Sequence, residues 1–257
     1  MKVSYISDLH LDFHAPFHKN QIKWQRRTRN FILNLIETDI DREVIVIAGD
    51  ISHFNMQSIW ALEVFSDYYE QVFLTDGNHD NYLISKSQSN KYNNNHHNRV
   101  FELIDLTSKM KNVKFLGSFI EYEFKGKTFA GSNFWYPLEN TNQQMFFHNI
   151  SNDSKLISGA DHESIHEQHL FEMERYECLG WVDVIVTHVP PISINSHYKY
   201  NSTVCYLAPV KELKANRYIF GHCHEQSVYE KAGSKFYINA VGYPDEKLEL
   251  SIKSFTI

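Results

Sequence analysis

The sequence has few cysteines and no long apolar run. Its three cysteines, Cys178, Cys205 and Cys223, are odd in number and form no CxxC pair among 257 residues. This argues against a disulfide framework or a cysteine-rich zinc site and favours a reducing compartment. No apolar stretch approaches the roughly 18 residues that would suggest a membrane span.

The amino terminus lacks the signs of a secretory leader. Residues 1–6 run straight into Asp8 and His10, without a long apolar segment or a cleavage signal. We therefore predict a soluble, cytoplasmic protein with no membrane partner.

Positive charge is not in excess either. Lys and Arg number 25 against 31 Asp and Glu, which gives a net charge of −6, and the pI is near 6.2. Nucleic acid stays open as a partner, but the chain has no strong basic footprint for it. Apolar side chains are plentiful: 42% of the residues are hydrophobic and 14% are aromatic, enough to bury a sizeable core.

Hydrophobic patterning in the first half alternates between strands and helices. Short apolar runs at residues 3–6, 44–48 and 72–74 are typical of buried strands. Between them, apolar residues at three- and four-residue spacing predict helices around residues 28–36 and 56–69. This order favours an α/β unit with a parallel sheet.

The second half predicts a mixture of elements. The polar, Asn- and His-rich stretch 87–98 has no periodicity and indicates an exposed loop. The other expected elements are a helix at 99–110, a β-meander at 113–134, an acidic helix at 161–179, strands at 182–187 and 217–220, and closing antiparallel pieces at 227–229, 235–238 and 248–252. The chain shows no repeat, so we predict a single domain over residues 1–257, with two sheets flanked by helices.

Five short fragments, most of them placed after an apolar β-like run, carry the residue types that bind metals. They are Asp8-Leu9-His10, Gly49-Asp50, Gly77-Asn78-His79-Asp80, Thr187-His188 and Gly221-His222-Cys223-His224. Each fragment alone is ordinary, because turn aspartates are common. In this order they indicate loops at strand ends that converge on one site.

The spacing and side chains of the fragments suit two divalent ions. Asp8 and His10 are one residue apart, so in an extended segment both point to the same side. Asp50 follows a glycine after a buried strand, where tight backbone geometry suits a bridging carboxylate. Amide oxygens and imidazoles, as in Asn78 and His188, favour Mn, Fe, Zn or Ni. Two such ions roughly 3.5–4 Å apart would clamp a phosphate and turn a bridging water into hydroxide.

The ordered fragments resemble the motif series of the calcineurin-like metallophosphoesterase superfamily: D-x-H, G-D, G-N-H-[DE], H and G-H-x-H. The resemblance covers the chain from Asp8 to His224. It implies a fold of two facing mixed β-sheets flanked by helices, a four-layer sandwich. It also implies roles for eight residues: a first metal on Asp8, His10 and His224; a bridging Asp50; a second metal on Asn78, His188 and His222; and a catalytic imidazole, His79.

Two departures from the superfamily's protein phosphatases bear on the substrate. Those enzymes carry Asp-Arg-Gly after G-D and an arginine before G-N-H-E, whereas this chain has Asp50-Ile51-Ser52-His53 and Thr75-Asp76. The arginines that grip a phosphomonoester are missing, and so is the aspartate expected to orient the catalytic histidine. The G-N-H-D form is similar to that of superfamily phosphodiesterases. We therefore predict a phosphodiesterase acting on a nucleotide-like or other small substrate, with manganese as the expected ion in vitro.

Alternatives remain at this stage. The enzyme alternative is a phosphomonoesterase acting on small molecules or proteins, and the non-enzyme alternative is a metal-containing interaction module. Candidates for the substrate pocket are His53, Trp135 and His197. The aromatic segment 133–148 around Trp135 suits either a wall for a nucleobase or core packing, and core packing is favoured. Three histidines share one face of the helix expected at 161–179, namely His162, His166 and His169; the acidic residues around them favour a solvated surface over a metal site.

Overall fold

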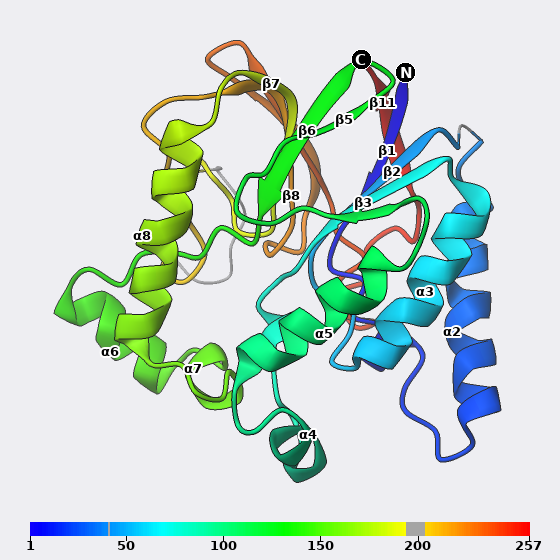
Figure 1. The fold of residues 1–257 in the computed structure, drawn as a ribbon, viewed down its shortest axis with the longest axis horizontal. Helices are drawn as coiled ribbons and strands as arrows, with labels where there is room; N and C mark the ends of the chain where they lie inside the picture. Colours follow the sequence, from blue (N-terminus) through cyan, green and yellow to red (C-terminus); the bar gives the residue numbers. More distant parts are fainter. Residues whose placement is uncertain (41, 194–203) are drawn as a thin grey trace.

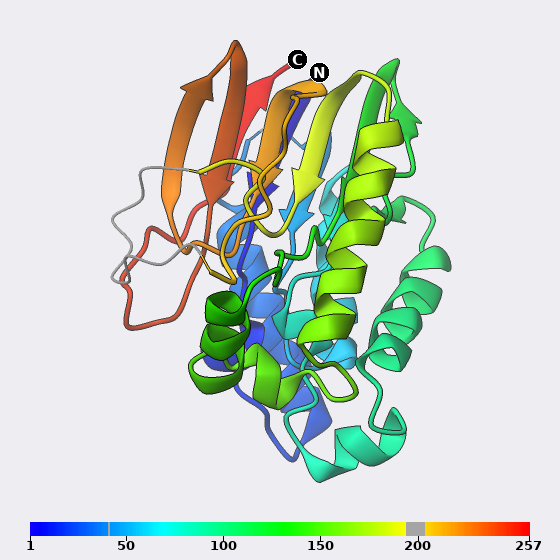
Figure 2. The same cartoon turned by 90° about the vertical axis from the view of Figure 1, so that its left-hand side faces the viewer.

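Two mixed β-sheets face each other at the centre of the molecule, and helices cover their outer faces (Figures 1 and 2). The computed structural model describes residues 1–40, 42–193 and 204–257. This arrangement confirms the fold class predicted from the sequence. Within the described ranges, no helix has both the length and the apolar character needed to cross a bilayer.

The first sheet has the strand order β11-β1-β2-β3-β4. Its parallel strands are β1 (Lys2–Ile6), β2 (Val44–Ala48), β3 (Gln71–Thr75) and β4 (Val113–Phe115), and β11 (Lys253–Thr256) pairs antiparallel with β1. β2 is buried along its whole length because helices cover one face and the second sheet covers the other. Such a strand needs a continuous β-branched run rather than an alternating pattern.

Three long helices lie outside the first sheet: α2 (Gln21–Ile36), α3 (Asn55–Tyr68) and α5 (His96–Ser108) (Figure 1). The buried side chains of α2 recur at helical spacing on one face, at Trp24, Thr28, Ile32, Leu35 and Ile36. Short turns in the loops of this half are α1 (Leu11–His14), the 3-10 turn η1 (His79–Asn81) and α4 (Lys86–Lys91).

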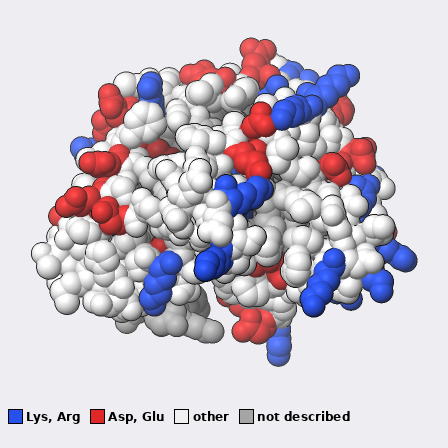
Figure 3. Space-filling view, turned by 60° about the horizontal axis from the view of Figure 1, so that its bottom comes forward, with Lys and Arg blue, Asp and Glu red and all other residues white. Residues whose placement is uncertain are grey.

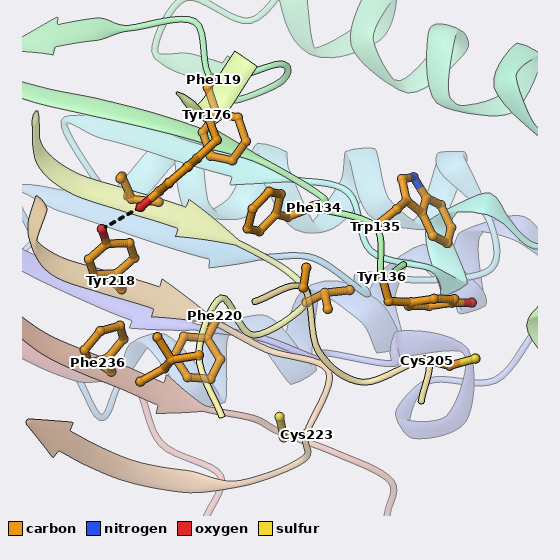
Figure 4. Packing of buried hydrophobic residues seen from close by; sticks show 14 of the residues in the cluster. Phe119, Phe134, Trp135, Tyr136, Tyr176, Cys205, Tyr218, Phe220, Cys223 and Phe236 are labelled. Atoms are coloured by element: carbon orange, nitrogen blue, oxygen red, sulfur yellow. Dashed lines mark hydrogen bonds between the residues drawn. The ribbon is translucent and has the colours of Figure 1, made fainter. Parts of the chain in front are cut away.

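The second sheet has the strand order β5-β6-β7-β8-β10-β9. Its strands are β5 (Tyr122–Phe124), β6 (Lys127–Ser132), β7 (Val182–Thr187), β8 (Ala215–Phe220), β9 (Gln226–Lys231) and β10 (Ser234–Asn239). Its outer side carries α8 (His162–Cys178), with α6 (Thr141–Asn149) and α7 (Asp153–Leu156) beside it (Figures 1 and 2). Aromatic side chains fill this layer, where the hydroxyls of Tyr176 and Tyr218 lie 3.0 Å apart (Figure 4).

The stretch 87–98 was predicted as an exposed loop, and that prediction is wrong. It contains the end of α4 and the first turn of α5, capped by the side chains of Ser85 and Asn95. Gln88 and His96 are buried, because Gln88 donates to the carbonyl of His53 and His96 contacts Asn81 at 2.8 Å. Polar residues that pair with one another inside a protein carry no hydrophobic period in the sequence.

The expected β-meander at 113–134 is also wrong. β4 pairs in parallel with β3 and ends the first sheet, whereas β5 and β6 form an antiparallel hairpin that begins the second. The closing pieces at 227–229 and 235–238 do pair antiparallel, as β9 and β10, but β10 also pairs in parallel with β8. The last strand is β11 rather than the predicted 248–252. Short strands of similar composition do not reveal which sheet they join.

Candidate metal centre

The five fragments lie in loops at the carboxyl ends of β1, β2, β3, β7 and β8. Backbone hydrogen bonds tie these loops together, from Asp8 N to Gly49 O at 3.1 Å and from Gly221 N to His188 O at 3.0 Å. The carboxyl ends of parallel strands in both sheets therefore open onto one shared site, as expected for open α/β sheets.

One group of ligand atoms surrounds His10. Its Nε2 lies 2.9 Å from His224 Nε2 and 3.8 Å from Asp50 Oδ2, and His224 Nε2 lies 3.7 Å from Asp8 Oδ1. Two ring nitrogens about 3 Å apart have the separation expected of two ligands on one ion, because metal–nitrogen bonds are about 2 Å long. The three residues Asp8, His10 and His224 lie together as one candidate cation cluster.

A second group lies on the other side of Asp50. His188 Nε2 is 3.4 Å from Asp50 Oδ2 and 3.0 Å from Asn78 Oδ1. Asp50 thus stands between the two groups, in the place that a bridging carboxylate needs. His222 lies beside His188, with ring centroids 5.0 Å apart.

Three ligand histidines use their second ring nitrogen to contact an acceptor. His188 Nδ1 is 2.9 Å from Ala48 O, His222 Nε2 is 2.7 Å from Cys205 O, and His224 Nδ1 is 2.7 Å from Glu246 Oε2. A carbonyl or carboxylate oxygen only accepts, so each contacting nitrogen carries the proton. In the neutral ring the other nitrogen, His188 Nε2, His222 Nδ1 or His224 Nε2, has a lone pair for a metal. The donor set of carboxylates, an amide oxygen and imidazoles fits divalent ions from Mn to Zn.

The backbone at the ligands is unusual. Five of the seven predicted ligand residues have positive φ, namely Asp8 (51°), His10 (39°), Asp50 (54°), His222 (68°) and His224 (44°). Non-glycine residues rarely adopt the left-handed region. Such strain concentrates at functional sites, where the surrounding structure enforces it.

Glycine at position 77 has a steric cause. A Cβ added there would lie 2.1 Å from Asp50 Oδ1. Only glycine lets the loop after β3 pass so close to the bridging carboxylate.

Buried charges in this site are strongly coupled. Burial lowers the pKa of His10 well below its ordinary value, and the neighbouring His79 lowers it further. Burial also lowers the pKa of His188, but the Asp50 carboxylate outweighs it and raises that pKa to about 10. Without metal, His188 and Asp50 therefore form a buried ion pair. Metal binding must displace the proton of His188.

His79 and His53 form a stacked pair at the edge of the site. Their rings are nearly parallel, at 8°, and His53 Nε2 is 2.9 Å from His79 Nδ1. His53 Nδ1 in turn lies 2.8 Å from Asp12 Oδ2. Because the carboxylate only accepts, His53 carries a proton on Nδ1; in the neutral ring its Nε2 then accepts from His79 Nδ1–H. This leaves His79 Nε2 facing the site, 3.4 Å from the hydroxyl of Tyr243.

No partner for His79 was predicted from the sequence, and the structure shows one in His53. His53, predicted as a possible pocket residue, contacts His79 directly, and Asp12 contacts His53 in turn. Asp12 stands two residues after His10, and that spacing was the available signal. His79 is also held by its backbone N–H, which donates to Asp50 Oδ1 at 2.8 Å.

Two further buried groups position the loops. The carboxylate of Asp80 accepts backbone N–H groups of Asp50 at 2.8 Å and Gly77 at 2.9 Å, and burial raises the pKa of Asp80 to about 7. Arg99 is fully buried and donates to the carbonyls of Ser52 and His79. Its guanidinium therefore holds the two loops together through their backbone carbonyls. Sequence reasoning assigned neither residue a role.

Asp153 on α7 orients the amide of Asn78. Asn78 Nδ2 donates to Asp153 Oδ1 at 2.8 Å, and the hydroxyls of Tyr82 and Tyr136 donate to the same carboxylate. Since a carboxylate accepts only, the amide nitrogen must face Asp153, and Asn78 Oδ1 must face His188 and the metal cluster. Nothing in the sequence pattern linked residue 153 to residue 78.

The remaining predicted residues lie elsewhere. Trp135 is 3% exposed and packs in the core beside the second sheet (Figure 4). Of the two alternatives for this residue, core packing therefore agrees with its position. His197 lies outside the described residues. His169 is buried and its Nδ1 contacts the carbonyl of Trp135, so the prediction of a solvated histidine face is wrong for that residue.

Comparison with known proteins agrees with this geometry. Residues 1–226 match the family described as calcineurin-like phosphoesterase. The phosphopantetheinyl hydrolase PptH of Mycobacterium tuberculosis is similar in structure, with a TM-score of 0.63 and 18% identity over 95% of this chain and 90% of that one. A putative 5′-nucleotidase from Staphylococcus aureus is more distant, with a TM-score of 0.41 and 16% identity over 100% of this chain and 56% of that one. An archaeal phosphodiesterase has a TM-score of 0.36 and 12% identity over 100% of both chains. No curated protein matches the sequence.

The chain belongs to the calcineurin-like phosphoesterase family. It is a metallophosphoesterase, a hydrolase of phosphate esters, in a family that uses a dinuclear centre of divalent metal ions.

Proposed function

We propose that this enzyme hydrolyses phosphodiesters of a nucleotide-like or other small substrate. The carrying observation is the Asp12–His53–His79 arrangement, which directs one ring nitrogen of His79 into a cluster of metal ligands. That nitrogen suits proton transfer to a leaving oxygen.

The charge around the cluster supports a diester over a monoester. The fragments that line the site contain no Lys or Arg, and the guanidinium of Arg99 is directed to backbone carbonyls. A diester carries one negative charge, whereas a monoester carries nearly two at neutral pH, so a site with no arginine among the fragments that line it in the described part of the chain favours the diester. The surface is consistent with a substrate of low negative charge, because Lys and Arg are scattered over the face in Figure 3 rather than gathered in one patch.

In the mechanism that we propose, the predicted ligands would hold two ions: Asp8, His10 and His224 would bind one, Asn78, His188 and His222 the other, and Asp50 would contribute to both. Such ions supply charge neutralisation and an activated water. The doubly protonated ring of His79 would donate its Nε2 proton to the leaving oxygen and return to the neutral form with a proton on Nδ1, through which His53 keeps the ring in position. Asp12 favours the tautomer of His53 that accepts this hydrogen bond.

The test is hydrolysis of bis(p-nitrophenyl) phosphate by protein loaded with Mn²⁺, compared with p-nitrophenyl phosphate at equal metal content. Faster turnover of the diester is expected. A clear preference for the monoester would make the protein a phosphomonoesterase instead. Absence of turnover with every divalent metal, together with partner binding that survives Asp50→Asn, would make it an interaction module.

We also propose manganese as the ion that supports activity in vitro and the cytoplasm as the compartment. Imidazole and carboxylate ligands accept manganese readily. The three cysteines form no disulfide, which suits a reducing environment. Metal analysis of protein purified from its own cells would test the proposal of manganese.

A further inference from the structure

Phe13 is an exposed aromatic residue at the mouth of the metal centre. It lies on α1, three residues after His10, and 47% of its surface is exposed. The centroid of its ring lies 4.9 Å from that of Tyr243 and 5.8 Å from that of His53, and both pairs are arranged edge to face. A single exposed aromatic residue is ordinary, so its position beside these two rings is what bears on ligand binding.

Tyr243 reaches the same mouth from a segment beyond residue 226, where the family match ends. Its ring stacks on His10 with centroids 4.5 Å apart and planes at 26°. Its backbone N–H donates to Glu246 at 2.7 Å, and the N–H of Gly242 donates to the carbonyl of Asp8 at 3.0 Å. The segment is therefore fixed to two parts of the metal centre.

The two rings lie on the side of the site where His79 acts. The Tyr243 hydroxyl is 3.4 Å from His79 Nε2, the nitrogen that faces the site. Phe13 contacts His53, which holds His79 from behind. The group that receives a proton from His79 must leave past these two aromatic side chains.

We propose that Phe13 and Tyr243 form a leaving-group subsite, which selects phosphodiesters whose leaving alcohol carries a flat aromatic or heterocyclic ring. This inference rests on the proposed function. A ring in the leaving group would pack against Phe13 and the face or edge of Tyr243, whereas an alkyl group would leave both rings in contact with water. Contacts between aromatic rings correspond to a preference of about 3- to 10-fold.

The experiment compares two diesters that share one esterified group and differ in the leaving alcohol, one aryl and one fluoroalkyl of matched acidity. Phe13→Leu and Tyr243→Leu should each lower the aryl-to-alkyl ratio of kcat/KM by about 3- to 10-fold. Tyr243→Phe keeps the ring and should retain the ratio. Phe171→Leu is the matched control, because Phe171 is also 47% exposed but lies on α8. Equal loss on both substrates, or an unchanged ratio in both leucine variants, overturns the subsite.

A binding measurement separates this proposal from the proposed function. Phenylphosphonate and ethylphosphonate are not hydrolysed, so their affinities for the Mn²⁺-loaded protein can be compared by calorimetry. Tighter binding of phenylphosphonate, lost in Phe13→Leu, supports the subsite. Equal affinities overturn it. If the protein binds phenylphosphonate preferentially but hydrolyses no ester, the proposed function fails and the subsite stands.

Discussion

His53 lies parallel to His79, with its Nε2 2.9 Å from His79 Nδ1 and its own Nδ1 held by Asp12. The imidazole that we propose as catalytic is therefore positioned by a second imidazole rather than directly by a carboxylate. Because an imidazole stands between Asp12 and His79, the tautomer of His79 is fixed without a negative charge directly against its ring.

His53→Ala should lower kcat by about 10- to 100-fold, because His79 loses the acceptor that fixes its proton on Nδ1. KM and metal content should stay near the parent values. Steady-state kinetics with metal analysis would measure this. Long-range ¹H–¹⁵N spectra of the metal-free protein should show His79 changing its tautomer.

Asp12→Asn provides the companion test, since an amide can donate to His53 and reverse its tautomer. A kcat loss of about tenfold or more is expected from disrupted proton transfer. Asp105→Asn is a suitable control because Asp105 is exposed on α5 and its carboxylate pairs with Lys109 at the surface. If Asp12→Asn behaves like that control, Asp12 has no part in catalysis.

Asp153→Asn should weaken metal binding by about 10- to 100-fold, the usual range for a residue that orients a ligand. The new amide no longer requires the nitrogen of Asn78 to face it, so the Asn78 oxygen loses its fixed direction. Titration calorimetry with Mn²⁺ would measure the affinity. Tyr82→Phe removes one hydroxyl but keeps the carboxylate, so its affinity should fall less; a larger fall than in Asp153→Asn would contradict the role given to Asp153.

Metal should stabilise the fold through Asp50. At a free concentration 100 times Kd, one bound ion adds about 2.7 kcal/mol to the unfolding free energy, which is about 5–10 °C in Tm for a chain of this size. Thermal scans with Mn²⁺ and with EDTA should show that shift in the parent protein and in His79→Ala. The shift should be largely lost in Asp50→Asn. Its loss in His79→Ala would instead make His79 a metal ligand.

Glu172 should make the stability of the protein pH-dependent. Burial raises its pKa to about 7 from an ordinary 4.5, so the folded state holds this proton more tightly than the unfolded state. The contribution is therefore complete below pH 4.5 and is lost as pH rises to about 7, by at most about 3 kcal/mol. Urea unfolding of the parent and Glu172→Gln at several pH values would measure it. The parent should lose stability relative to the variant as pH rises.

The seven metal ligands could be proposed from the sequence because each sits at the end of a strand, within a short motif whose order reflects the sheet, and they stay a prediction. Asp8 and His224 are far apart in the chain, but both follow strands whose ends meet at one edge. The hydrophobic pattern of the sequence predicted the two sheets and their main helices.

The supporting residues could not be found in this way. Asp153 meets Asn78, and Tyr243 meets His79, only through contacts between segments that no local pattern connects. The buried polar residues of α4 and α5 looked like a loop because they satisfy one another with hydrogen bonds instead of apolar packing. Whether a strand joins the first or the second sheet is likewise decided by tertiary contacts, as β4 and β5 show.

The left-handed backbone at Asp8, His10, Asp50, His222 and His224 lowers the stability of the folded protein while it places side chains for metal binding. Each such residue is held in a conformation that costs about 1 kcal/mol or more, and glycine would relieve that cost while removing a ligand. An engineer who selects only for resistance to heat in the absence of metal would therefore drift toward an inert protein. Selection in the presence of the ions would keep the strained loops, because only the loaded form recovers the energy stored in them.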